Sequence, residues 1–245
     1  PRQRLEFLEA RREQVLQRDD CALEMAVLYV QLEQYSAARQ LLLSRRFNIY
    51  EGGEGKLTRL HGWLCTLLGV REANPEKPLN WFREALVFPE NYGEGRHYSA
   101  QEGNIHYYTG LLLESLGDRE TAGAHYREAA GQPSHITEIS FFAGKALEKL
   151  GHADRARELY EAMLESARIR LENADLPGYF GVGMASPLPF EQNVVRQNSI
   201  PALLIKALAL KGLGRESESR EALETLLSLD PHGTPLAYFR SLGIL

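Results

Sequence analysis

Cysteine is scarce in this chain, with two residues among 245, Cys21 and Cys65. A disulfide framework would need more, so we expect both to be small core residues of a protein from a reducing, cytoplasmic compartment. No apolar run is long enough to span a membrane, since the most apolar one, 200–210, contains Lys206 and is followed by Lys211. No secretory signal opens the sequence. Basic residues are not in excess either, because 28 Lys and Arg face 33 Asp and Glu, which argues against a nucleic-acid partner.

The chain does contain an internal repeat. A glycine is followed by a small, a large and another apolar residue at offsets of 5, 9 and 12, and this occurs twice, 34 residues apart. The residues are Gly117, Ala122, Tyr126 and Ala129 in the first copy and Gly151, Ala156, Tyr160 and Met163 in the second. A period of 34 with this pattern is typical of the tetratricopeptide helix-turn-helix repeat. The sequence therefore predicts stacked helical hairpins.

Each position of the pattern has a physical reason. The glycine ends the first helix, because a left-handed residue at a helix C-terminus carries no Cβ penalty when it is glycine. The small residue lets the second helix cross the first closely, and the tyrosine one turn later fills the gap toward the next hairpin. A single hairpin cannot bury its apolar face, so several must stack.

The predicted fold is an all-α, right-handed superhelical array of about five such hairpins with a capping helix at each end. An amphipathic helix at 2–18 precedes the first repeat, in which Glu33 stands where glycine is usual. The second hairpin covers 56–88, and the repeats quoted above are the third and fourth. The fifth repeat covers 200–229, and 235–245 forms the C-terminal capping helix.

A long insertion interrupts the array between the fourth and fifth repeats. The loop near 173–198 contains several Gly and Pro beside aromatic residues. Long irregular loops in compact domains are often functional, and this one is too aromatic for a plain linker. We interpret residues 1–245 as a single solenoid domain which, since it starts at Pro1 without Met, is expected to be part of a longer protein.

Two loops rich in Gly and Glu are the most unusual stretches, one from Arg45 to Lys56 and one from Phe88 to His97. Both lie between hairpins, so neighbouring connections could bring them together, and glycine lets the backbone approach a ligand or partner. Three interpretations compete: tight turns held by Glu–Arg pairs, docking on another domain, and a carboxylate pair for glycoside hydrolysis drawn from Glu51, Glu54, Glu94 and Glu102. The candidate binding residues of these loops and their surroundings are Arg46, Glu51, Glu54, Glu94, Arg96, Glu102 and His106.

The sequence gives little support for a phosphate-binding loop or a metal site. The run Gly53-Glu54-Gly55-Lys56 is not a phosphate loop, because Tyr50 stands where the earlier Gly is required and Leu57 where Ser or Thr is required. His61 and Cys65 have metal-ligand spacing on a helix, but no second pair accompanies them and core packing is the simpler interpretation. We expect no catalytic residue, no metal and no cofactor.

The first helix of each hairpin lines the concave surface of such an array. Outward positions on that surface are Lys56, Arg59, Trp63, Asn104, Tyr107, Glu138 and Phe141. Aromatic residues interleaved with both charge signs suit a peptide, a loop of a partner domain or a saccharide. For Trp63, Tyr107 and Phe141, packing in the core is an equal alternative.

Several motifs together resemble a known group of proteins. They are Arg18-Asp19-Asp20, Arg46-Phe47, Glu51-Gly52-Gly53-Glu54-Gly55-Lys56, Gly93-Glu94-Gly95 and Gln101-Glu102-Gly103-Asn104-Ile105-His106-Tyr107. The set is similar to the C-terminal repeat region of large bacterial tetratricopeptide proteins, whose uncharacterised N-terminal region resembles sugar-active β-sandwich enzymes. Members of that group usually have His-Pro-Trp where this chain has Asn48-Ile49-Tyr50. The resemblance implies a carbohydrate-related neighbour domain in the same polypeptide.

The functional hypothesis that follows is a non-catalytic interaction or scaffolding module that docks on an adjoining domain or another protein. The alternative is an accessory part of a carbohydrate-active enzyme that contributes sugar-contacting carboxylates. Self-association through exposed repeat faces is a third hypothesis. The expected partners are a domain of the same polypeptide, a protein or peptide, or a saccharide, and neither nucleic acid nor membrane.

Overall fold

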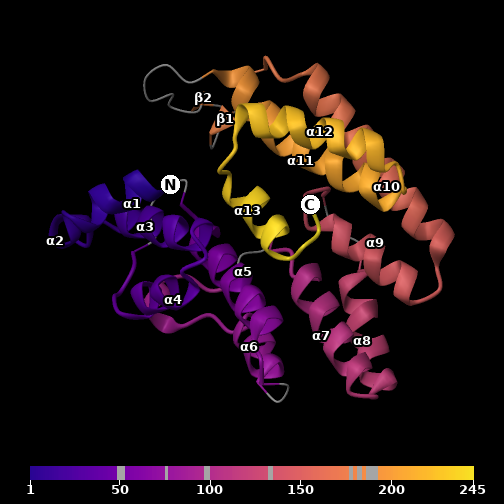
Figure 1. Cartoon of the computed structure of the whole chain (residues 1–245), viewed down its shortest axis with the longest axis horizontal. Helices are drawn as coiled ribbons and strands as arrows, with labels where there is room; N and C mark the ends of the chain where they lie inside the picture. Colours follow the sequence, from indigo (N-terminus) through magenta and orange to yellow (C-terminus); the bar gives the residue numbers. More distant parts are fainter. Residues whose placement is uncertain are drawn as a thin grey trace. The chain divides into compact units, whose positions relative to one another are not determined.

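The computed structural model describes residues 1–48, 53–74, 77–96, 100–131, 135–176, 179–180, 184–185 and 193–245. Apart from two short strands, the regular secondary structure of these residues is helical (Figure 1), so the predicted all-α fold of helical hairpins is confirmed. By its internal contacts the chain forms two compact units. Unit 1 comprises Pro1–His125 and His232–Leu245, and unit 2 comprises Tyr126–Pro231. The handedness of the array and its interpretation as a single domain stay predictions.

Unit 1 begins with α1 (Arg2–Glu9) and α2 (Arg12–Val15). Three hairpins follow: α3 (Asp19–Gln31) with α4 (Tyr35–Leu43), α5 (Lys56–Arg71) with α6 (Pro78–Glu84), and α7 (Gly103–Ser115) with α8 (Arg119–Ala129), whose last residues belong to unit 2. The short 3-10 helix η1 (Glu90–Tyr92) lies between the second and third hairpins, and α13 (Thr234–Ser241) completes the unit.

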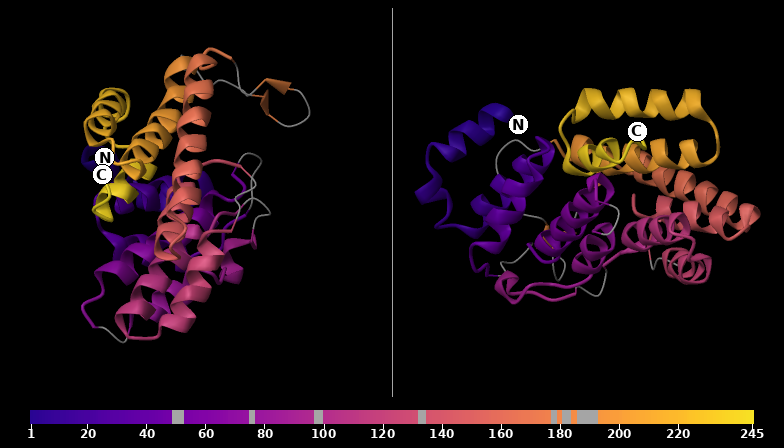
Figure 2. Two further views of the ribbon diagram at one scale, coloured as in Figure 1. Left: turned by 90° about the vertical axis from the view of Figure 1, so that its right-hand side faces the viewer. Right: turned by 60° about the horizontal axis from the view of Figure 1, so that its bottom comes forward.

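Unit 2 contains α9 (Ser140–Lys149), α10 (Ala153–Glu172), α11 (Val194–Gly212) and α12 (Glu216–Leu229). Helix α10 packs against α9 and α11, and α11 packs against α12, as Figure 2 also shows. Between α10 and α11 the strands β1 (Tyr179–Phe180) and β2 (Met184–Ala185) pair in antiparallel fashion. They lie within the predicted insertion, most of which falls outside the described residues.

The hairpin glycines behave as the repeat pattern predicts. Gly117, Gly151 and Gly214 have φ of +87°, +79° and +73°. In each case the residue after the glycine donates its backbone N–H to the carbonyl of the residue five positions earlier in the chain than itself. An example is Asp118 N to Leu113 O at 2.9 Å. This closes the helix end with the left-handed motif that glycine adopts without strain.

Glu33 occupies the same left-handed position without being a glycine. Its φ is +60°, and the following amide, Gln34 N, bonds to Tyr29 O at 2.8 Å as in the other repeats. The Glu33 carboxylate accepts two hydrogen bonds from the Arg71 guanidinium, at 3.0 and 3.2 Å. A non-glycine residue in this region costs on the order of 1 kcal/mol, and the contact with Arg71 at the end of α5 offsets part of that cost.

The tyrosine of the repeat fills the gap between successive hairpins. Tyr160 of α10 is buried, and its ring lies against Gly144 of α9 and Gly212 of α11. A Cβ at Gly144 would meet the ring at 2.3 Å, and one at Gly212 at 2.5 Å. Both neighbouring helices therefore need glycine at the point where the ring enters.

The predicted helix at 2–18 is wrong in one respect, because it is broken between α1 and α2. Arg11 leaves the helical conformation, with φ −126° and ψ 28°. Both Leu5 and Val15 are buried. In one straight helix these two side chains would point about 80° apart around the axis, so the break lets each reach the core.

Two further predictions need correction or extension. The helix predicted from Ile200 begins earlier, at Val194, because the Asn193 side chain caps it by accepting a bond from Arg196 N at 3.0 Å. The predicted C-terminal helix is present as α13, but it packs on α3 and α5 of unit 1, far from it in sequence.

Candidate functional site

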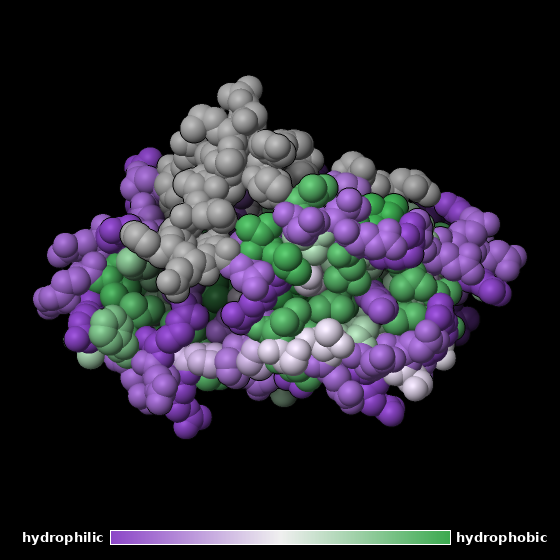
Figure 3. All heavy atoms as spheres, turned by 90° about the horizontal axis from the view of Figure 1, so that it is seen from above, coloured by the Kyte–Doolittle hydropathy of each residue, from purple (hydrophilic) through white to green (hydrophobic). Residues whose placement is uncertain are grey.

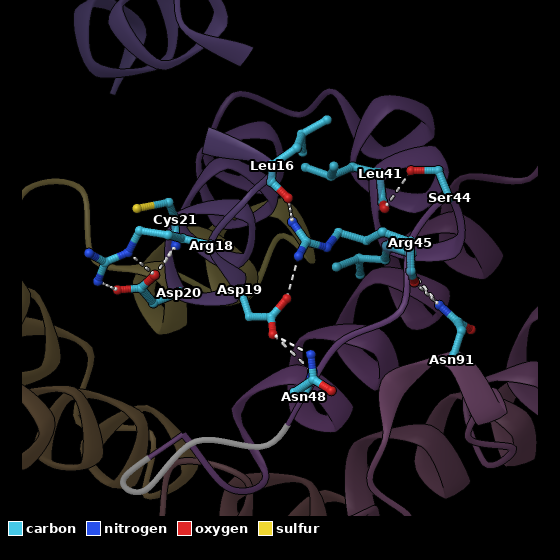
Figure 4. Close-up of polar contacts among 11 residues, drawn as sticks. Leu16, Arg18, Asp19, Asp20, Cys21, Leu41, Ser44, Arg45, Asn48 and Asn91 are labelled. Carbon is cyan, nitrogen blue, oxygen red and sulfur yellow. Dashed lines mark hydrogen bonds and ion pairs between the residues drawn. The ribbon is translucent and has the colours of Figure 1, made fainter. Parts of the chain in front are cut away.

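The first Glu-Gly loop is fixed at its start by a partly buried ion pair (Figure 4). Arg45 pairs with Asp19, the first residue of α3, and donates to Leu16 O at 2.7 Å. The other oxygen of Asp19 accepts bonds from the backbone N and side-chain Nδ2 of Asn48, at 2.9 and 3.2 Å. Arg45 and Asn48 therefore hold the start of this loop on α3, whereas the candidate binding residue Arg46 is exposed.

The two Glu-Gly loops meet in space. Phe47 N of the first loop donates to Asn91 O of the second at 2.7 Å, and Asn91 Nδ2 bonds to Arg45 O at 2.7 Å. Gly93 has φ +69°, and a Cβ there would lie 2.5 Å from Phe47 O. The glycine serves this close crossing of two backbones rather than a ligand.

Glu94 closes the N-terminus of α5. Its carboxylate accepts hydrogen bonds from Gly55 N at 2.9 Å and Thr58 N at 3.2 Å. A carboxylate is favourable at the positive end of a helix and satisfies amides that have no partner within the helix. Glu94 therefore has a structural role within the chain, as in the first of the three interpretations, although its partners are backbone amides and not an arginine.

Beneath the loops lies a buried polar group built on His61 of α5. Tyr92 Oη lies 2.9 Å from His61 Nδ1, and His61 Nε2 lies 3.0 Å from Glu84 O. The carbonyl must accept, so Nε2 carries the proton and the tyrosine hydroxyl donates to Nδ1. Burial lowers the pKa of His61 and raises the pKa of the neighbouring Cys65 thiol. Both are core residues, and in the described part of the chain no group of three or more His, Cys, Asp or Glu is arranged to hold a metal.

Glu102 and His106 lie near the start of α7. Arg96 pairs with Glu102 at 2.5 Å. Burial raises the pKa of Glu102, and the nearby Arg96 acts in the opposite direction. His106 stacks on His125, with Nδ1 atoms 3.1 Å apart. The Arg96–Glu102 pair joins the second loop to the third hairpin, and the histidine stack joins the two helices of that hairpin.

An open groove lies between α3 and α5 and has a volume of about 280 Å³. It collects three of the predicted concave-surface residues, Lys56, Arg59 and Trp63. The groove is also lined by residues that the sequence analysis did not predict as binding residues: Asp20, Leu23, Glu24, Val27, Leu60, Thr234 and Pro235. The last two belong to α13, and no sequence pattern could have placed them beside α5.

The charges along this groove are unequal. Asp20 is held by Arg18 at 2.7 Å and Glu24 by Arg4 at 2.5 Å. Lys56 and Arg59 are exposed, and neither forms an ion pair with any described residue. The groove therefore offers two cations above an apolar floor, a combination that suits an acidic partner segment.

The other predicted residues are placed as follows. Asn104 is buried, Tyr107 is half-buried at the edge of Tyr108, and Phe141 is buried beside Phe142 and Tyr160. For Trp63 and Phe141 the core alternative holds. Arg46 and Glu54 are exposed, Glu138 is half-buried in unit 2, and Glu51 lies outside the described residues.

A second groove, of about 700 Å³, lies in unit 2 between α10, α11 and α12. Its floor contains Leu164, Leu171, Leu210 and Leu213. Each carboxylate on its rim is paired with an arginine, as in Arg157–Glu161 and Arg215–Glu218. Figure 3 shows one face of the molecule, on which hydrophobic side chains lie between hydrophilic ones. This groove carries no charge preference for a partner.

Comparison with known families bears on the last hairpin. The family model described as tetratricopeptide repeat matches residues 200–232. This range contains α11 from Ile200 to its end and all of α12. Residues 200–232 are therefore similar in sequence to a tetratricopeptide repeat. Such repeats commonly provide extended concave surfaces that bind other proteins. No solved structure matches the chain.

The described helices also bear on a membrane role. None of them is both long enough and apolar enough to cross a bilayer. Helix α11, which contains the most apolar run of the sequence, carries Lys206 within that run and Lys211 in its last turn.

Proposed function

We propose that this chain is a non-catalytic protein-interaction module and that the groove between α3 and α5 binds an acidic segment of its partner. The proposal is supported chiefly by Lys56 and Arg59, which form no ion pair with described residues while the opposite wall is neutralised by Arg18 and Arg4. An acidic segment would pair with these cations and lie over Val27, a half-buried apolar residue of the groove.

The partner we favour is an adjoining domain of the same polypeptide. The resemblance of the loop motifs to bacterial tetratricopeptide proteins with a carbohydrate-related region is the reason for this choice. The alternative of sugar-contacting carboxylates has less support, because Glu94 bonds to backbone amides of α5 and Glu102 pairs with Arg96.

A peptide titration tests the proposed groove. A labelled peptide of alternating Glu and Leu is titrated against the full chain by fluorescence anisotropy, at low and at high salt. We expect Arg59→Glu to weaken binding about fivefold, because it replaces an attractive charge by a repulsive one at a partly screened site. Binding should also weaken at high salt.

The matched control is Arg220→Glu, which makes the same charge change on an exposed residue of α12 outside the groove. It should leave the affinity unchanged. An equal loss in both variants would mean a general charge effect, and a peptide of alternating Lys and Leu that bound as well as the acidic one would refute the proposed selectivity.

A further inference from the structure

Helix α13 lies on the surface that a ligand of the first helices would use. Tyr238 of α13 stacks on the indole of Trp63 in α5, with ring centroids 4.7 Å apart and planes inclined by 12°. Its hydroxyl accepts a hydrogen bond of 2.7 Å from Asn104 Nδ2 of α7. Trp63 and Asn104 are two of the positions at which the repeat pattern predicts ligand contact. The chain's own C-terminal helix covers them.

The helix is anchored at both ends as well as at its centre. Gln31 Nε2 donates to Thr234 Oγ1 at 3.1 Å, and Tyr35 Oη donates to Ser241 Oγ at 3.1 Å. Leu236, Tyr238 and Phe239 are buried. These three side chains span a wide arc of the helix and pack it into the core of unit 1, to which α13 belongs.

The fit is nevertheless incomplete, and the connection of α13 is unusual. Gln31 Oε1 is buried without a hydrogen-bond partner, and an unsatisfied buried acceptor lowers the stability of the contact. The chain enters α13 from Pro231, the last residue of unit 2. The hairpins α3–α4 and α5–α6 lie within Asp19–Glu84, so neither contains a residue of α13.

We propose that α13 is an intramolecular occupant of this surface and that a helical segment of the partner protein replaces it. This inference rests on the proposed function, since it describes how the same binding face is regulated. The replacing helix carries a tyrosine directed at Trp63 and Asn104 and an aliphatic residue two positions before it, as Leu236 precedes Tyr238. Acidic residues before that helix reach Lys56 and Arg59, because the open groove continues from Thr234 and Pro235 at the start of α13.

The first test is amide hydrogen exchange on the full chain, which needs no ligand. The amides of α13 should exchange faster than those of α3 and α5. Tyr238→Phe removes only the hydroxyl that Asn104 bonds to, and it should speed exchange in α13 about tenfold while α3 and α5 are unchanged. Equal acceleration in all three helices would show that α13 is an inseparable part of the core and would overturn the inference.

The second test uses the helix itself as the probe. A labelled synthetic peptide of residues 232–245 is titrated against the full chain and against its Tyr238→Ala variant, in which the resident helix is weakened. We expect at least about tenfold tighter binding to the variant, because less of the competing helix has to be displaced. A control peptide with Ala in place of Tyr should not bind.

These outcomes separate the inference from the proposed function. Equal affinity of the 232–245 peptide for both chains would overturn the displacement of α13, whatever the acidic peptide does. If the 232–245 peptide binds as expected but the acidic peptide does not, the helix-binding surface stands and the role of Lys56 and Arg59 fails.

Discussion

At the scale of single residues, the most unusual part of the sequence is explained by contacts within the chain. Asp19 holds Arg45 and Asn48, and Gly93 passes close to Phe47. Such sets of polar and glycine residues look functional in a sequence, because polar groups with special backbone needs also mark binding loops. Here they fix two connections to each other and to α5.

Glu94 provides the residue-scale prediction. Glu94→Gln keeps the shape of the side chain but removes the charge at the N-terminus of α5, so we expect a loss of about 1 kcal/mol of stability in unit 1. Urea unfolding, together with hydrogen exchange at the first turn of α5, measures the effect. Glu54→Gln is the matched control in the neighbouring loop, since Glu54 is exposed and its change should stay within about 0.5 kcal/mol. Equal effects of the two changes would contradict the capping role.

At the scale of helices and hairpins, packing depends on pairs of residues from different repeats. Tyr160 fits because Gly144 and Gly212 leave room on both sides, and Phe82 lies against Gly69 in the second hairpin in the same way. Close packing of neighbouring helices at these points thus depends on an aromatic side chain on one helix and a glycine on the other.

Gly144 provides the prediction at this scale. In Gly144→Ala the new Cβ would lie 2.3 Å from the Tyr160 ring, which is buried and also lies against Gly212. We expect destabilisation of unit 2 by about 1–3 kcal/mol, measured by hydrogen exchange in α9 and α10.

Gly62→Ala in α5 is the comparison, because its Cβ would meet Ile105 Cδ1 at an ordinary 3.5 Å. With room available, alanine in a helix interior should be neutral or stabilising by up to about 1 kcal/mol. If both substitutions had the same sign and size, the close packing of Tyr160 would not be what requires glycine at 144.

At the scale of the whole molecule, the chain forms two compact units, each with its own buried apolar side chains. Leu64 of α5 and Met163 of α10 are both fully buried, one in each unit. If each unit unfolds cooperatively by itself, a cavity in one core should not loosen the other.

A pair of cavity variants tests this division. Leu64→Ala should lower the stability of unit 1 by about 2–5 kcal/mol, and Met163→Ala should do the same in unit 2. Hydrogen exchange resolved along the chain should show faster opening in α3–α5 and α13 for the first variant and in α9–α12 for the second. Acceleration across both units in either variant would show that they open together.

The sequence alone determined the hairpins, because a left-handed glycine after a helix and a small residue four before a tyrosine act through neighbours within one or two turns. It also determined that Ala156, Tyr160 and Met163 face inward, as they do. It did not determine that Glu94 caps α5, that the two loops cross, or that α13 covers Trp63 and Asn104. These contacts join residues far apart along the chain, and which distant segments meet depends on the packing of the whole hairpins. The open groove beside Lys56 and Arg59 was likewise decided by the tertiary structure, since its walls come from α3 and α5 and from the distant start of α13.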